Sequence, residues 1–208
     1  MDRNRYSKRN IEEDKEERRM NEREWVKSIC QKIENALREF DENLRVGESL
    51  KLPYSSEVLE YDEKGKPIQE HLIKYETDIL VYELTTVTNW TPRVVIEAKI
   101  SRISTHDSIT YSNKAQTHKN VHPYLRYGIL IGNMKNDPLP GRLFRHGQQF
   151  DFMLSWKSFD ATNEEWNNLI DILRLEVKAS QSLEEIIFNS RSSNRERYTV
   201  LHKPLILI

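Results

Sequence analysis

Cysteine and long apolar runs are scarce in this sequence, and each scarcity excludes a class of protein. Cys30 is the single cysteine of the 208 residues, which rules out an internal disulfide and a cysteine-rich zinc site and fits a reducing compartment. No apolar run approaches the roughly 20 residues of a membrane-spanning helix, and the charged N-terminus does not resemble a signal peptide. No GxxxxGK[ST] motif is present to bind a nucleotide cofactor. We therefore expect a cytoplasmic protein that neither enters a membrane nor uses a nucleotide.

The chain also lacks net charge, although it is rich in charged residues. Its formal net charge is −1, while Asp, Glu, Lys and Arg make up 31% of the residues. Any attraction to nucleic acid must therefore come from local patches. Charges of both signs crowd residues 1–19, which we expect to be an arm, either solvated and frayed or in contact with phosphates or a second subunit. Residues 20–208 are expected to form a single domain.

Three charged residues lie within segments that otherwise have the composition of buried strands. Residues 75–82 form an apolar run around Asp78, and residues 93–100 form another around Glu97 and Lys99. Thr, Asn and Pro in residues 85–92 predict a turn between the two strands. An unpaired buried charge costs several kcal/mol, roughly, so a partner or a metal must compensate these side chains.

The segments on either side predict the rest of the fold. Helical spacing of apolar residues is found in residues 21–41, 108–125, 163–175 and 182–189, with Asp107 or Ser108 as the expected cap of the second helix. Gly65 predicts the turn of a hairpin within residues 57–82. Apolar strands are expected at residues 127–132 and 150–156, and the apolar end at 204–208 must be covered. This order indicates an α/β fold with a mixed central β-sheet flanked by helices on both faces.

The three charges can form one chemical site. Strand alternation places Glu97 and Lys99 on one face, while Ile96 and Ala98 face the other way. If the two strands pair, Asp78 approaches the same point, and two carboxylates that close resist joint ionisation unless a cation lies between them. Oxygen ligands favour Mg²⁺, and the lysine can orient or deprotonate an attacking water or offset developing charge. The alternative is a cross-strand ion pair on a solvated face.

With eighteen residues between Asp78 and Glu97-Ala98-Lys99, the sequence resembles the PD-(D/E)XK nuclease superfamily, which has the restriction-endonuclease-like fold. Thr77 departs from this pattern, because the family has Pro there. The resemblance covers about residues 20–156 as a common core and leaves the C-terminal helices and tail, 157–208, unassigned. It implies that Asp78, Glu97 and Lys99 are catalytic. It also implies that Asp78, Glu97 and the backbone carbonyl of Ala98 bind Mg²⁺, with Mn²⁺ able to substitute.

Further site residues are implied by the same resemblance. Many members place a glutamate of the first helix near the metal, and Glu22, Glu24 and Glu34 are the candidates here. Members often contribute a Lys or Gln from the helix after the motif, which makes Lys114 and Gln116 candidates; otherwise this is the solvent face of that helix.

Several cationic residues are candidates for contact with DNA, either at base edges or at phosphates. They lie beyond the second strand, on the next helix and after a Pro/Gly loop: Arg102, His106, His118, Lys119, Arg142, Arg145 and His146. His118 and His122 have a spacing that suits zinc, but no third ligand is evident.

We therefore expect a Mg²⁺-dependent DNA endonuclease, most similar in layout to a type II restriction enzyme that cuts double-stranded DNA at a specific site. Cutting both strands of a palindrome implies a homodimer, with the N-terminal arm or the apolar C-terminus as its interface. Two alternatives stay open: a repair, recombination or mobile-element nuclease of the same fold, and a non-catalytic DNA-binding protein.

Overall fold

The fold is taken from a computed structural model that describes residues 20–135 and 138–188. The charged arm, the end of the last predicted helix and the apolar C-terminus lie outside these residues. In chain order, the elements are α2 (Glu22–Arg38), β1 (Leu44–Glu48), β2 (Lys51–Tyr61), β3 (Pro67–Glu76), β4 (Ile79–Leu84), β5 (Trp90–Ile100), α3 (Thr105–Val121), β6 (Arg126–Gly132), α4 (Gly141–His146), β7 (Phe152–Ser155) and α5 (Asn163–Phe188).

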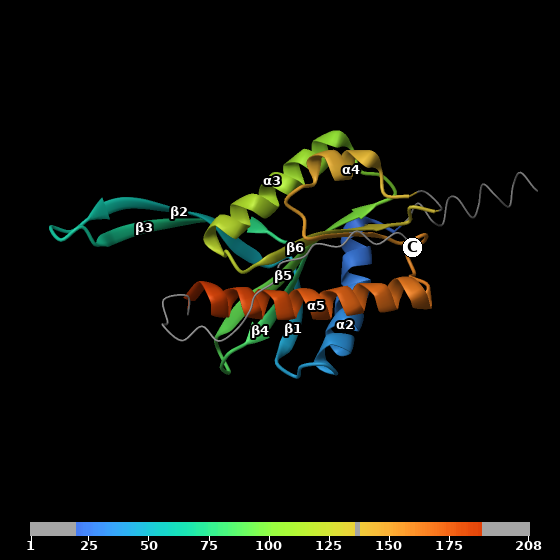
Figure 1. Cartoon of the computed structure of the whole chain (residues 1–208), viewed down its shortest axis with the longest axis horizontal. Helices are drawn as coiled ribbons and strands as arrows, with labels where there is room; N and C mark the ends of the chain where they lie inside the picture. The colour runs from blue at the N-terminus through green and yellow to red at the C-terminus, as the bar shows by residue number, and fades with distance from the viewer. Residues whose placement is uncertain (1–19, 136–137, 189–208) are drawn as a thin grey trace, which may run out of the picture.

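The centre of the molecule is a five-stranded sheet with the order β1-β4-β5-β6-β7 (Figure 1). β1, β4 and β5 pair antiparallel, whereas β5, β6 and β7 pair parallel. The parallel step from β5 to β6 needs a crossover, and α3 supplies it. The predicted α/β fold with a mixed central sheet is therefore confirmed.

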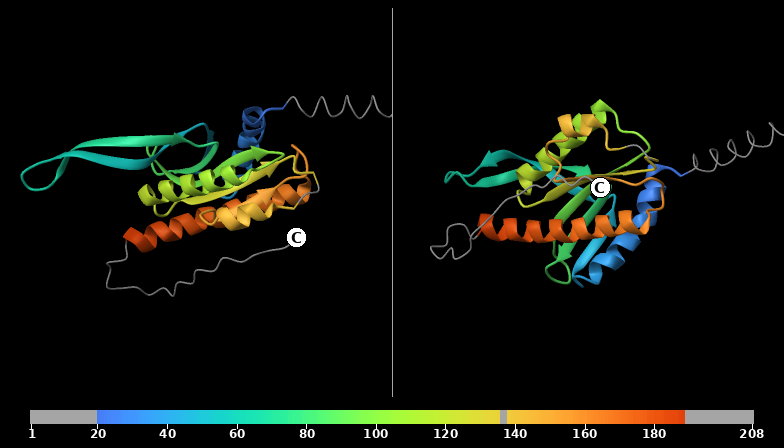
Figure 2. Two further views of the ribbon diagram at one scale, coloured as in Figure 1. Left: turned by 90° about the horizontal axis from the view of Figure 1, so that it is seen from above. Right: turned by 45° about the vertical axis from the view of Figure 1, so that its right-hand side comes forward.

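Helices cover both faces of this sheet, as predicted. α2 and α5 lie on one face, and α3 and α4 lie on the other (Figures 1 and 2). The alternation of β5 explains the two layers, because Ile96 and Ala98 pack with Leu37 of α2 and Leu173 of α5. Val95 faces the opposite layer, which contains side chains of α3 and α4.

The first helix is shorter than predicted. A capping box begins α2, in which the Asn21 side chain accepts from Glu24 N–H and the Glu24 carboxylate accepts from Asn21 N–H. The helix ends at Arg38, so Phe40 lies beyond it and is 38% exposed instead of continuing the apolar face.

β2 and β3 form a separate two-stranded hairpin that projects from the rest of the molecule (Figure 2). Its turn contains Gly65 at φ +75°, a backbone conformation that favours glycine, so the predicted turn is confirmed. The prediction of one strand over residues 75–82 is wrong. The hairpin ends at Glu76 because the N–H and hydroxyl of the buried Thr77 both donate to Leu50 O, each at 2.9 Å.

Three other boundaries differ from the prediction for local reasons. Ser104 caps α3 with Asp107 as the third helical residue, so neither Asp107 nor Ser108 is the cap. The two helices expected after residue 163 are one continuous helix of 26 residues, α5. β5 already begins at Trp90, since a shift in register opposite Tyr82 accommodates Pro92 in the strand. Among the described residues, no helix has the length and apolarity needed to cross a membrane.

Candidate active site

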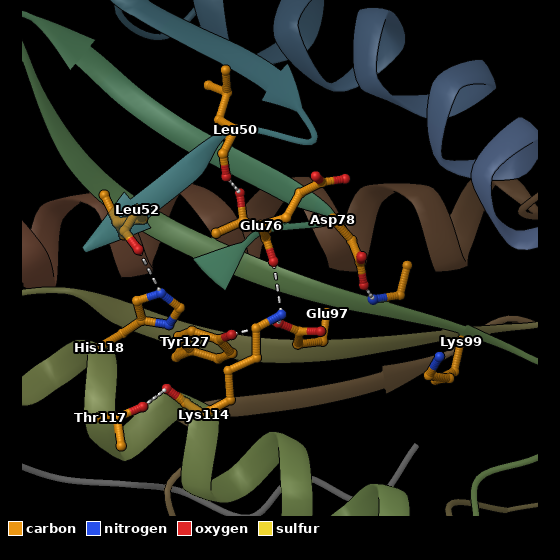
Figure 3. A network of polar contacts seen from close by, with 12 residues as sticks. Leu50, Leu52, Glu76, Asp78, Glu97, Lys99, Lys114, Thr117, His118 and Tyr127 are labelled. Carbon is orange, nitrogen blue, oxygen red and sulfur yellow. Dashed lines mark hydrogen bonds and ion pairs between the residues drawn. The ribbon is translucent and has the colours of Figure 1, made fainter. Parts of the chain in front are cut away.

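Asp78 lies in the short break between β3 and β4, beside the middle strand of the sheet (Figure 3). The antiparallel register pairs Ile79 with Ile96. Asp78, just before β4, therefore lies beside the residues of β5 that follow Ile96. Asp78 Oδ2 accepts a hydrogen bond from Ala98 N–H at 2.8 Å. Because the chain breaks between β3 and β4, the Asp78 carboxylate, and not a backbone carbonyl, accepts the hydrogen bond of Ala98 N–H.

The backbone carbonyl of Ala98 adds a second oxygen on the side of β5 that faces Asp78. In a strand, the N–H and C=O of one residue point to the same side. Since Ala98 N–H is directed at Asp78, the Ala98 carbonyl also faces the side of β5 on which Asp78 lies.

Glu97 is a buried carboxylate, only 1% exposed, with two partners on one oxygen. Tyr127 OH donates to Oε1 at 2.5 Å, and Lys114 Nζ lies 2.7 Å from the same atom. Burial raises the pKa of Glu97 to about 7 against the effect of the Lys114 ammonium, and the nearby Asp78 carboxylate adds to the rise. Glu97 and Asp78 are therefore close enough to repel each other.

Lys114 connects α3, Glu97 and the base of the hairpin. Besides its ion pair with Glu97, its ammonium donates to Glu76 O at 2.8 Å and lies over the Tyr75 ring. Gln116, the other candidate on α3, instead donates to Asn120 on its own helix. Of the two, the structure brings only Lys114 to the carboxylates.

Lys99 lies on the same face of β5 as Glu97, beside Tyr111 of α3, which precedes Lys114 by one helical turn. Its Nζ is 3.0 and 3.1 Å from the two Glu22 carboxylate oxygens and 5.0 Å from the centre of the Tyr111 ring. Burial alone would lower the pKa of Lys99, but the Tyr111 hydroxyl and Glu22 outweigh it and raise the pKa above the ordinary lysine value. The Lys99 side chain is therefore a charged ammonium that Glu22 and Tyr111 keep in position.

These contacts separate the three candidate glutamates of α2. Glu22 reaches Lys99, whereas Glu24 closes the helix cap and Glu34 accepts from Val46 N–H at 2.9 Å. Burial raises the pKa of Glu22, and the Lys99 ammonium opposes this rise. Glu22 is thus the one of the three that lies at the site.

The oxygen atoms at the site that could bind a metal ion are those of the Asp78 and Glu97 carboxylates and of the Ala98 carbonyl. Within residues 20–135 and 138–188, no group of three or more His, Cys, Asp or Glu side chains is arranged to hold a metal ion. Two carboxylates and a carbonyl are nevertheless a suitable donor set for Mg²⁺, which keeps several waters in protein sites. Burial is the main cause of the raised pKa of Glu97, and the Asp78 carboxylate adds to it; a cation between the two carboxylates would relieve that repulsion.

Two of the predicted DNA-contacting residues have structural roles instead. His118 is fully buried, and its Nε2 lies 3.3 Å from Leu52 O. Because a carbonyl only accepts, this nitrogen donates, and a DNA strand cannot reach the ring. Lys119 Nζ donates to Gln149 O at 2.7 Å and pairs with Asp151 at 2.8 Å.

The other five candidates are exposed and come from the two segments that follow β5 and β6. Arg102 and His106 lie in the loop after β5 and at the start of α3, and Arg142 Nη1 donates to Ile103 O at 3.1 Å. This bond ties α4, which also carries Arg145 and His146, to the loop after β5. The sequence predicted a Pro/Gly loop just before these residues and assigned no element to them, and the helix gives their side chains a fixed spacing.

Tyr127 and Tyr111 also lie at the site, although no pattern in the sequence indicated them as site residues. Tyr127 begins the apolar run of β6 and has the pattern of a core residue. Only the pairing of β5 with β6 brings its hydroxyl to Glu97.

No protein-family model matches this sequence, and no curated protein sequence matches it either.

Proposed function

We propose that the protein is a Mg²⁺-dependent DNA endonuclease. The observation that carries this proposal is the meeting of Asp78 and Glu97 at the backbone of Ala98, with the Lys99 ammonium on the same face of the strand. An ordinary surface ion pair does not explain this arrangement, because Asp78 pairs with a backbone N–H and Lys99 pairs with Glu22.

The order of the elements supports a restriction-endonuclease-like core. α2 is followed by three strands that pair antiparallel, β1, β4 and β5, then by α3 and by the parallel strand β6. The hairpin of β2 and β3 is an insertion between the first two strands of this unit. Asp78 immediately precedes the second strand of this unit, β4, and Glu97 lies on the third, β5.

In this proposal, Asp78, Glu97 and the Ala98 carbonyl hold Mg²⁺. The ion, when bound, stabilises negative charge on the phosphate and makes a bound water more acidic. Tyr127 and Lys114 fix the Glu97 carboxylate in place. Lys99, kept as an ammonium by Glu22 and Tyr111, offsets charge on the phosphate and does not serve as the base.

The exposed basic side chains on one side of the site suit a DNA backbone. Arg102, His106, Arg142, Arg145 and His146 follow the C-terminal ends of β5 and β6, where Lys99 also lies. Such side chains position a duplex through its phosphates, and Arg can also read guanine. A type II restriction enzyme acting as a homodimer is the form of this function that we favour.

The proposal is tested by incubating a long mixed-sequence DNA with the protein and Mg²⁺ and then sequencing the ends. Discrete ends at one short sequence are expected for a restriction enzyme. Random ends, or cleavage confined to single strands or branched DNA, would instead favour a repair, recombination or mobile-element nuclease. Equal DNA binding with Mg²⁺ or EDTA, without any cut, would overturn the proposal in favour of a non-catalytic DNA-binding protein.

A further inference from the structure

The hairpin of β2 and β3 exposes apolar side chains that nothing in the described residues covers. It projects from the molecule, and within residues 20–135 and 138–188 its two strands pair only with each other (Figure 2). Leu59 is 62% exposed, Ile68 57% and Leu72 48%. A two-stranded hairpin is marginally stable alone, and three or more strands are normally needed. The exposed apolar residues therefore indicate a surface that binds another protein chain.

The charge of the hairpin argues against DNA as that partner. Residues 51–76 contain six carboxylates and four lysines, a net charge of −2 with histidine neutral. A DNA-binding arm must neutralise phosphates, and an excess of carboxylates repels them. The hairpin thus differs from the cationic segments beside the candidate active site.

The two edges of the hairpin differ in their ability to pair. β2 contains two extra residues, Tyr54 and Leu59, where its register with β3 shifts. Bulges of this kind protect an edge from pairing. From Gln69 to Glu76, by contrast, every residue of β3 follows in register, so this stretch is a regular edge. A new strand would add at β3.

The sequence of this edge is complementary to itself. In an antiparallel pair of two β3 strands with a twofold axis at Leu72, Leu72 lies opposite Leu72 of the second copy. Glu70 then lies opposite Lys74 of the second copy, and the same pair recurs on the other side of the axis. Opposite charges facing each other stabilise a strand pair, and like charges destabilise it.

We infer that β3 pairs with β3 of a second copy of this chain, joining the two hairpins into a four-stranded sheet across a twofold axis. Such an isologous interface is self-complementary, as a twofold dimer requires. The inference does not rest on the proposed nuclease chemistry. If both hold, the base of the shared sheet lies next to each active site, because Lys114 binds both Glu76 O and Glu97.

The test is sedimentation velocity of the full chain over a range of concentrations, without DNA or metal. The wild type is expected to form dimers. Glu70→Lys or Lys74→Glu alone creates two like-charge contacts and should raise the dimer dissociation constant about tenfold or more. The double variant, with both substitutions, should restore it. Glu60→Lys, on the bulged strand, is the matched control and should leave it unchanged.

A second measurement locates the axis. Leu72→Cys places two thiols opposite each other, at a Cβ separation of about 5 Å, and mild oxidation should link the chains covalently. Leu59→Cys is more exposed but lies on β2, and it should not cross-link. Native Cys30 is buried and serves as an internal blank. A monomer at all concentrations, an unchanged dimer in both single charge variants, or no cross-link through Leu72→Cys would overturn the inference.

Discussion

Asp78 Oδ2 accepts a hydrogen bond from Ala98 N–H at 2.8 Å, which joins the residue just before β4 to the C-terminal part of β5. This contact exists because Thr77 is drawn to Leu50 O, which ends β3 and separates it from β4. The candidate site is therefore built at an interruption of the sheet and not within two continuous strands.

Tyr127→Phe should weaken metal binding without moving a metal ligand. Its hydroxyl donates to Glu97 Oε1, so removing it frees the carboxylate to turn and leaves a hydrogen bond unmade. We expect about tenfold weaker Mg²⁺ or Mn²⁺ binding by calorimetry. The free energy of unfolding should fall by about 1 kcal/mol. Tyr61→Phe, on the exposed hairpin, is the control, and unchanged metal affinity in Tyr127→Phe would refute the role of Tyr127.

Glu22→Ala and Glu24→Ala should separate catalysis from stability on the same helix. Glu22 holds the Lys99 ammonium, so its loss should slow single-turnover cleavage roughly ten- to a hundredfold by misplacing that charge. Glu24 closes the capping box, so its loss should lower the free energy of unfolding by on the order of 1 kcal/mol and leave the rate unchanged. Equal rates for the two variants would contradict the assignment of Glu22.

His118 should make the protein sensitive to mild acid. Burial lowers the pKa of His118 from 6.5 to about 4, because a charged ring cannot be solvated there. The unfolded chain takes up this proton first as pH falls. The stabilising contribution is therefore complete above pH 6.5 and is lost between pH 6.5 and 4, at a cost of up to roughly 3 kcal/mol.

The check is chemical denaturation at pH 7 and pH 4.5 for the wild type, His118→Gln and the exposed control His71→Gln. The wild type and His71→Gln should lose stability in parallel, and His118→Gln should lose clearly less. A parallel loss in all three proteins would mean that His118 titrates normally in the fold.

Gly132→Ala should test the packing that brings Glu22 to the sheet. A Cβ at Gly132 would lie 2.6 Å from the ring of Trp25, which is fully buried on α2. Such overpacking costs about 1–3 kcal/mol, which thermal unfolding will measure. Gly141→Ala meets nothing within 4 Å and is the control. Equal melting temperatures would show that α2 adjusts freely.

Local patterns in the sequence were sufficient for much of this fold. Period-two alternation separated Glu97 and Lys99 from Ile96 and Ala98, and the packing of the two faces agrees with it. Gly65 correctly marked the turn of the hairpin. These features depend on neighbours in the chain, which a sequence pattern contains.

The errors concern interactions between residues far apart in the chain. The end of β3 depends on Leu50, 27 residues before Thr77, and Tyr127 lies 30 residues from Glu97. Among the glutamates of α2, only the placement of the helix against β5 selects Glu22. His118 lies in a stretch of polar residues that resembled the solvent face of a helix. It is buried because Tyr75 at the base of the hairpin and Tyr127 of β6 pack against its ring. Register and packing of this kind are not encoded in local spacing.

The central claim is most directly tested by cleavage of plasmid DNA with the wild type and Asp78→Asn. Asparagine keeps an oxygen for Ala98 N–H and removes only the charge, so the fold is preserved. Asp62→Asn, at another hydrogen-bonded aspartate in the hairpin turn, is the control. We predict that the wild type and Asp62→Asn cut with Mg²⁺ and not with EDTA. We also predict that Asp78→Asn is slower by about a hundredfold or more. A wild type that never cuts, or an Asp78→Asn variant as fast as the wild type, would contradict this account.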